Sequence, residues 1–209
     1  MEKQKAILLM GFWFALLVTL LNIGSTLLPL LTKGGFSSFI LGFPVAILFV
    51  IMLVSVHYYA PEEKRIFSLI GVAFSIACVA LLGFNYYFMM CSSRLGELPA
   101  LLNLTNPNSI IWVVEILGYG FMGLSTLFAA FVFGRGKLAK TVKWLFIVHG
   151  ILGIGGMVGY ALEWNMTILL GGLIFWDILF PLMTLCLAIL FKKELKSNDY
   201  TYTSECPSK

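Results

Sequence analysis

Two carboxylic acids, Glu115 and Asp177, lie inside long apolar stretches of the chain, where ionisable side chains are rare. Placing such a group in the hydrocarbon region of a membrane costs about 2.5–3.5 kcal/mol on insertion scales, so it usually faces protein or a water-filled cavity. A carboxylate in this position can coordinate a cation, exchange a proton with a solute, or act as an acid or base in catalysis. These two residues are therefore the first candidates for a functional site.

Three neutral polar residues, Asn22, Asn85 and His149, also interrupt apolar stretches. All five residues belong to rows of small or polar side chains at helical spacing, which predict a polar face on each helix. One interpretation is a ligand-binding pocket in which Glu115 and Asp177 are acidic anchors and the other three supply hydrogen bonds. The alternative is that the polar groups bond across helices and fix packing, at about 0.6 kcal/mol per bond on average. Packing is the preferred interpretation for the asparagines, and the pocket is preferred for the carboxylates.

No catalytic, cofactor or metal site is predicted from motifs. The two histidines, His57 and His149, lie on separate helices without an obvious third ligand, so hydrogen bonding is preferred to metal binding. The chain has no HExxH, GxSxG or Walker pattern, and no lysine lies deep in an apolar stretch. The four cysteines show no CxxC spacing.

The composition indicates a membrane protein without a separate aqueous domain. Of the 209 residues, 60% are hydrophobic and 11% are charged, and the mean hydropathy is +0.96. A soluble domain carries about 25% charged residues, and six spans of about 20 residues each use nearly the whole length. The net charge of +4 comes from residues beside helix ends and forms no basic face, so no nucleic acid partner is predicted.

The predicted fold class is all-α, an integral membrane bundle of six transmembrane helices. The expected spans are 6–31, 36–59, 66–91, 110–133, 144–162 and 166–191. Together they form one domain, residues 1–191, followed by a polar cytoplasmic tail, 192–209, that is predicted to lack fixed structure. The second span has no polar face and is expected to be the most exposed to lipid. The fifth span has a smooth face that predicts close helix approach, made by Gly150, Gly153, Gly155, Gly156 and Gly159. Of these, Gly155 and Gly159 have the small-xxx-small spacing.

The positive charges predict the orientation of the bundle. All but two of the 14 Lys and Arg residues lie in the N-terminus, the second and fourth connections, and the tail; the exceptions are Lys33 and Arg94. The positive-inside rule therefore places both termini in the cytoplasm, N-in/C-in. Trp112, Trp144 and Trp164 fall at expected helix ends, as in an aromatic belt.

The stretch 115–123, Glu-Ile-Leu-Gly-Tyr-Gly-Phe-Met-Gly, is followed by an apolar stretch and a basic turn. This pattern resembles a family of small multi-pass bacterial membrane proteins of unknown function. The resemblance covers the fourth and fifth spans only. It implies a bacterial cytoplasmic membrane, and it supplies no activity, substrate or site residues.

Three functions remain open at this stage. The first and preferred one is a small membrane protein with a binding or accessory role, with a membrane protein partner or a homo-oligomer. The second is a carrier or channel for a small polar or cationic solute that uses Asp177 and Glu115. The third is a membrane-embedded enzyme that acts on a lipid, with one of these acids or a histidine as acid or base. The lipid bilayer is the partner common to all three.

Overall fold

The computed structural model describes residues 2–32, 36–92, 99–103, 106–134 and 136–205, and the regular secondary structure of these residues is helical, without a strand. Six long helices and three short 3₁₀ helices account for it: α1 (Glu2–Thr32), α2 (Phe36–Tyr59), η1 (Glu62–Lys64), α3 (Arg65–Cys91), η3 (Ala100–Leu102), α4 (Ile110–Ala129), η4 (Ala130–Val132), α5 (Lys137–Ala161) and α6 (Met166–Glu205). Within the described residues, 6 helices are long and apolar enough to cross a membrane. The prediction of an all-α bundle of six transmembrane helices is confirmed, and the N-in/C-in orientation stays a prediction.

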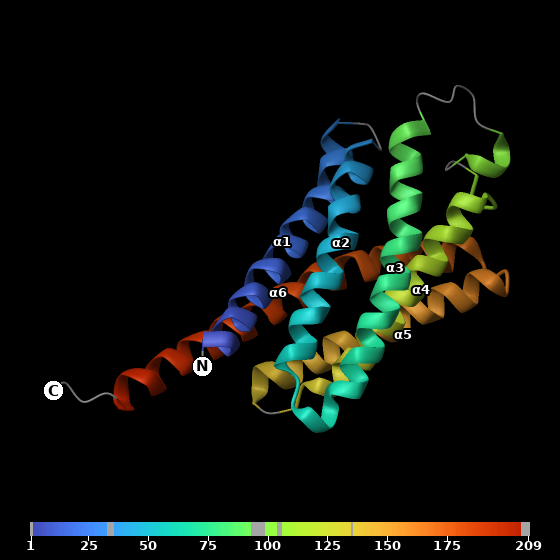
Figure 1. The fold of residues 1–209 in the computed structure, drawn as a ribbon. Coiled ribbons are helices and arrows are strands. Elements are labelled where there is room, and N and C mark those ends of the chain that lie inside the picture. Colours follow the sequence, from blue (N-terminus) through green and yellow to red (C-terminus); the bar gives the residue numbers. More distant parts are fainter. Residues whose placement is uncertain (1, 33–35, 93–98, 104–105, 135, 206–209) are drawn as a thin grey trace.

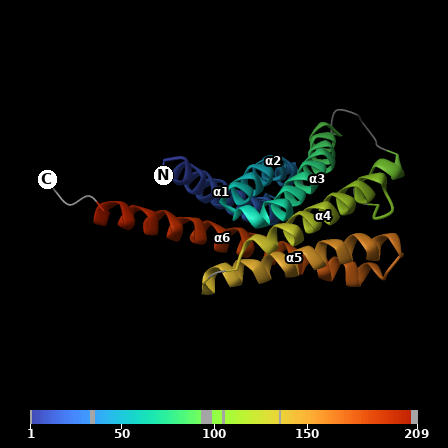
Figure 2. The ribbon, with the colours of Figure 1, turned by 60° about the horizontal axis from the view of Figure 1, so that its bottom comes forward.

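The helices form a closed ring in chain order. Each long helix packs against the one before it and the one after it, and α6 returns to pack against α1. Figure 1 shows the beginning of α1, the end of α6 and the α2–α3 and α4–α5 connections toward one end of the bundle. The end of α1, the beginning of α2, the end of α3, the beginning of α4 and the α5–α6 connection lie toward the opposite end, which is the arrangement expected of helices that cross a membrane alternately. Figure 2 shows α4 and α5 side by side, with α6 extending past the beginning of α1.

The two largest differences from the expected helix boundaries both concern segments with basic residues. Helix α5 begins at Lys137 and not at 144, so Lys137, Lys140 and Lys143 lie on its first turns. Gly136, with φ 83°, makes the bend that precedes it. Helix α6 continues through residues 192–205, where an unstructured tail was expected. Lysine, glutamate and leucine favour helix, and no glycine or proline interrupts the segment before Pro207; residues 206–209 lie outside the described part of the chain.

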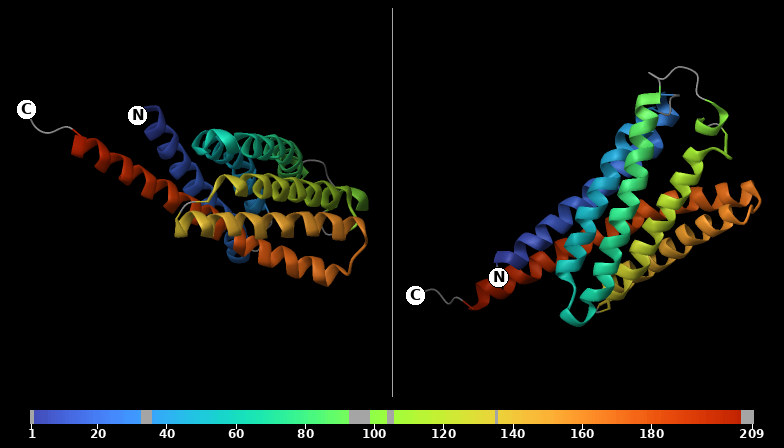
Figure 3. Two further views of the ribbon diagram at one scale, coloured as in Figure 1. Left: turned by 90° about the horizontal axis from the view of Figure 1, so that it is seen from below. Right: turned by 45° about the vertical axis from the view of Figure 1, so that its right-hand side comes forward.

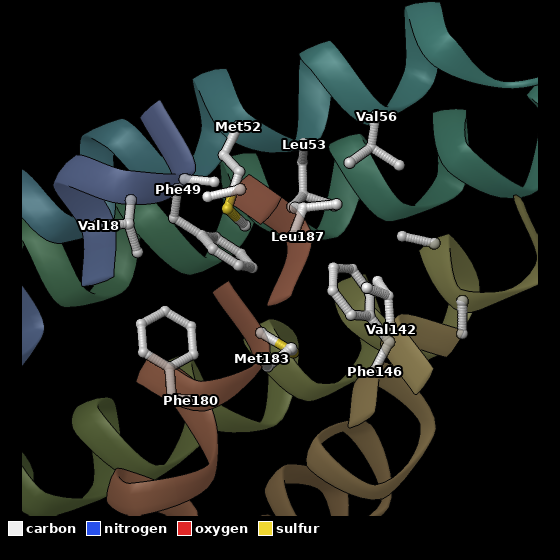
Figure 4. Packing of buried hydrophobic residues seen from close by; sticks show 14 of the residues in the cluster. Val18, Phe49, Met52, Leu53, Val56, Val142, Phe146, Phe180, Met183 and Leu187 are labelled. Carbon is white, nitrogen blue, oxygen red and sulfur yellow. The ribbon is translucent and has the colours of Figure 1, made fainter. Parts of the chain in front are cut away.

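The apolar core fills the half of the bundle nearer the chain ends, and α2 is central to it. Phe49, Met52, Leu53 and Val56 of α2 are all fully buried. Figure 4 shows them packed against side chains of α1, α5 and α6, such as Met183. The expectation that the second span is the most lipid-exposed is therefore wrong. Apart from Ser55, its buried face is apolar, so the scarcity of polar residues did not indicate exposure.

Glycines bring α4 and α5 into close contact, as the glycine run of the fifth span predicted. A Cβ added to Gly123 of α4 would lie 2.8 Å from the carbonyl oxygen of Gly150, and one added to Gly153 would lie 2.8 Å from that of Tyr119. The two glycines with small-xxx-small spacing differ from each other. A Cβ on Gly155 would meet nothing within 4 Å, whereas one on Gly159 would lie 2.6 Å from the ring of Trp164 and 3.0 Å from Leu169 of α6. The prediction of a close helix contact is therefore wrong at Gly155, and the contact with α4 is made by Gly150 and Gly153.

Candidate ligand-binding cavity

A cavity of about 380 Å³ lies between α1, α2, α3, α4 and α6. It occupies the part of the bundle farther from the chain ends, where the helix hairpins separate (Figure 3). Phe180 lines the cavity on the side of the apolar core, and its ring centroid lies 5.9 Å from that of the buried Phe49. The cavity therefore ends on an apolar floor, and it extends past Ser25 and Ser38 toward the α1–α2 connection.

Glu115 and Asp177 both line this cavity. At a rise of 1.5 Å per residue, Glu115 lies about 8 Å from the beginning of α4 and Asp177 about 16 Å from the beginning of α6. The described residues that line the cavity include no Lys, Arg or His. Two acidic side chains thus share one space, and the described residues that line it supply no cation.

The carboxylate of Glu115 is held by neutral donors from α3 and α4. The Tyr119 hydroxyl donates a 2.8 Å hydrogen bond to Oε1, and Nδ2 of Asn85 donates a 3.4 Å bond to Oε2. The Tyr86 hydroxyl lies 3.0 Å from the Tyr119 hydroxyl and extends the network to a second tyrosine. These bonds fix the direction of the carboxylate without cancelling its charge.

Asp177 of α6 and Asn22 of α1 both line this cavity, and each has a side-chain oxygen without a hydrogen-bond partner among the described residues. Asp177 makes no hydrogen bond or ion pair with another residue in the described part of the chain. Asn22 is 9% exposed, and its Oδ1 has no hydrogen-bond partner there. Because a buried polar atom without a partner costs about 1–3 kcal/mol, this part of the wall is suited to a ligand that brings hydrogen-bond donors.

Two of the five predicted site residues do not reach the cavity wall. Asn85 is fully buried behind Glu115 and acts on it by the hydrogen bond described above. His149 is also fully buried; its Nδ1 lies 2.9 Å from Oγ1 of Thr126, and its ring centroid lies 4.6 Å from that of Trp176. Trp176 itself lines the cavity, so it separates His149 from the space.

The second histidine, His57, lies on α2 near the opposite end of the bundle. Its Nδ1 is 2.9 Å from the hydroxyl of Ser68 on α3. Neither histidine is therefore placed to exchange a proton with a molecule in the cavity. Within the described residues, no group of three or more His, Cys, Asp or Glu side chains could hold a metal ion.

The sequence analysis did not identify Tyr86, Tyr119 and Trp176, which the structure places on the cavity wall. A signal was present for Tyr119, which follows Glu115 by one helical turn, whereas Tyr86 is only the direct neighbour of Asn85. Trp176 precedes Asp177 directly, and adjacency on a helix does not by itself predict that two side chains share a cavity.

The chain matches no protein-family model, no curated protein and no solved structure. The resemblance of the fourth and fifth spans to small bacterial membrane proteins therefore remains a proposal. The functional argument rests on the geometry of the cavity.

Proposed function

We propose that the protein is a membrane carrier for a small organic cation with N–H donors, such as an ammonium or guanidinium compound. The observation that supports this proposal is that Glu115 and Asp177 line one cavity that contains no basic side chain among its described lining residues. A cation bound there would be paired with carboxylate, and its N–H groups would satisfy Asp177 and Oδ1 of Asn22. A guanidinium group fits this need well because its planar fork of donors matches carboxylate geometry.

The placement of prolines favours a carrier over a fixed binding protein. Pro29, Pro44 and Pro181 lie within α1, α2 and α6, the helices that surround one side of the cavity. A proline removes one backbone hydrogen bond from a helix and permits a bend there. Bending at these positions would let the parts of the helices around the cavity move relative to the apolar core below it.

The apolar core gives the cavity one closed end. Met183 and Leu187 of α6 are fully buried below Phe180, on the side of the chain ends. A cavity that is open toward one end and closed by packed side chains at the other corresponds to one state of a carrier. Release of the solute on the far side would require these side chains to separate.

The other two functions receive less support from the geometry. The lipid-acting enzyme was expected to bring Glu115, Asp177 and a histidine together, and His149 lies behind Trp176 instead. An accessory role does not explain the two carboxyl groups, because helix packing alone rarely needs an acidic side chain inside the membrane. With the solute we propose also the bacterial cytoplasmic membrane and the N-in/C-in orientation, in which the cavity would open to the outside.

Uptake of radiolabelled guanidinium into vesicles that contain the purified full chain tests the proposal, since this cation stays charged and crosses lipid poorly. We expect uptake above that of protein-free vesicles, and Asp177→Asn should lower it at least about tenfold, as expected for the loss of a charged hydrogen-bond acceptor. The matched control is Glu62→Gln, which removes an exposed acid far from the cavity and should leave uptake unchanged. Wild-type uptake equal to that of empty vesicles, or full uptake by a folded Asp177→Asn variant, would reject the carrier.

A further inference from the structure

We propose that the ligand is amphiphilic and reaches the cavity from the lipid phase, through an opening between α1 and α6. This inference rests on the proposed cation site and adds the class of ligand and its route. The opening, of about 320 Å³, shares Asn22, Thr26 and Asp177 with the main cavity. The two spaces are therefore neighbours that meet at the side chains of Asn22, Thr26 and Asp177.

The remaining lining of the opening is apolar and faces outward. Ile23 and Leu27 of α1 are 40% and 52% exposed, and Ile174 and Ile178 of α6 are 65% and 64% exposed. All four lie in helices long and apolar enough to span a membrane, so their exposed surfaces would meet lipid chains. A molecule that enters here passes between aliphatic side chains and then meets an acid.

Aliphatic side chains at the outer part of the opening and an acid at its inner end match a molecule with a cationic head and an apolar tail. The cationic head would bind Asp177 and Asn22, and the tail would stay along Ile23, Ile174 and Ile178. A neutral acyl chain in the same opening would leave Asp177 and Oδ1 of Asn22 without donors, which costs free energy. Charge complementarity therefore selects a cationic amphiphile over an ordinary lipid tail.

A second apolar space, of about 290 Å³ between α4, α5 and α6, does not offer the tail an equivalent position. Tyr119 and Trp176 line both this space and the main cavity. Their ring centroids are 4.8 Å apart, so the two rings are in contact and form a wall between the spaces. The side chains that line both the α1–α6 opening and the main cavity are Asn22, Thr26 and Asp177, and none of them is an aromatic ring.

Binding of two guanidinium compounds by the full chain in lipid nanodiscs tests the inference. Methylguanidinium carries the head alone, and octylguanidinium adds a tail; empty nanodiscs supply the background. Each methylene that moves from water to an apolar surface strengthens binding about fourfold, so octylguanidinium should bind at least about tenfold more tightly. Ile178→Trp, which fills the opening, should weaken octylguanidinium binding about tenfold and leave methylguanidinium binding unchanged.

Ile189→Trp is the matched control, because Ile189 is an exposed residue on α6, 48% accessible, that does not line the opening. It should change the binding of neither compound. Should Ile178→Trp fail to fold, Ile23→Trp fills the opening from α1. Two results would overturn the lipid route while leaving the cation site intact. The first is that the wild-type chain binds the two compounds with equal affinity. The second is that the filled variants lose the same affinity for methylguanidinium as for octylguanidinium. Failure of both compounds to bind the wild-type chain would reject the cation site itself.

Discussion

The hydroxyl of Tyr119 donates a 2.8 Å hydrogen bond to Oε1 of Glu115, one turn earlier on the same helix. Because both residues lie on α4, the bond forms within one rigid element and does not depend on the packing of another helix. Asn85 reaches the second oxygen from α3. The carboxyl group of Glu115 is thus oriented by a donor on its own helix and by a second donor on α3. The side chain of Asp177 has no such partner among the described residues.

Tyr119→Phe should lower the affinity for guanidinium about two- to tenfold, since one hydrogen bond contributes about 0.5–1.5 kcal/mol. The ring contact with Trp176 would remain, so thermal stability should change little. Calorimetric titration measures the affinity for guanidinium of the purified wild-type protein and of the purified Tyr119→Phe variant. Tyr87→Phe is the control, because Tyr87 is 61% exposed and lies outside the cavity; equal affinities of Tyr119→Phe and wild type would contradict a role for Tyr119 in orienting Glu115.

His149→Phe separates a packing role of the histidine from a ligand-binding one. Phenylalanine preserves the contacts with Trp176 and Phe180, and Thr126 can still donate to the backbone carbonyl of Gly123 at 3.0 Å. We expect guanidinium affinity within about twofold of wild type and a loss of about 1 kcal/mol or less of stability. A large loss of guanidinium affinity with unchanged thermal stability would show that His149 takes part in ligand binding.

The number and type of the helices could be predicted from the sequence, because each apolar stretch is long enough to span a membrane. The presence of buried acids was also predictable, since the cost of burying a charge implies a cavity or a partner. What the sequence could not supply is the rotation of each helix about its axis. That rotation puts Glu115 and Asn22 on the cavity wall and His149 behind Trp176, and it depends on contacts between side chains far apart in the chain.

The same limit explains the two incorrect expectations about packing. On α2 the buried face is apolar apart from Ser55, so Phe49 and Met52 gave no sign that distinguishes a core from a lipid-facing surface. On α5 several glycines have suitable spacing, and only the position of α4 shows that Gly150 and Gly153 make the contact. In a membrane chain the environment outside the protein is as apolar as its core, so hydrophobicity does not identify the inner face.

Gly123→Ala should destabilise the bundle, because its Cβ would lie 2.8 Å from a backbone carbonyl oxygen that cannot move independently. Overpacking of this kind costs about 1–3 kcal/mol. Gly155→Ala is the matched control, since open space surrounds that position and alanine favours helix over glycine. Thermal unfolding in detergent should therefore show a lower midpoint for Gly123→Ala only. Equal midpoints for the two variants would mean that α4 and α5 are farther apart than in the structure.

The predicted orientation can be tested with single cysteines at Lys140, Lys193 and Glu163, in a background where all four native cysteines, Cys78, Cys91, Cys186 and Cys206, are replaced. Lys140 and Lys193 lie on the parts of α5 and α6 near the chain ends, and Glu163 lies in the connection at the opposite end (Figure 1). Because basic residues are retained on the cytoplasmic side, a maleimide that cannot cross membranes should label Glu163→Cys in intact cells. It should label Lys140→Cys and Lys193→Cys only after permeabilisation. Labelling of Lys140→Cys and Lys193→Cys from opposite faces of the membrane would contradict the six crossings. The reverse pattern at all three sites would mean that the cavity opens to the cytoplasm and that the carrier binds its solute there.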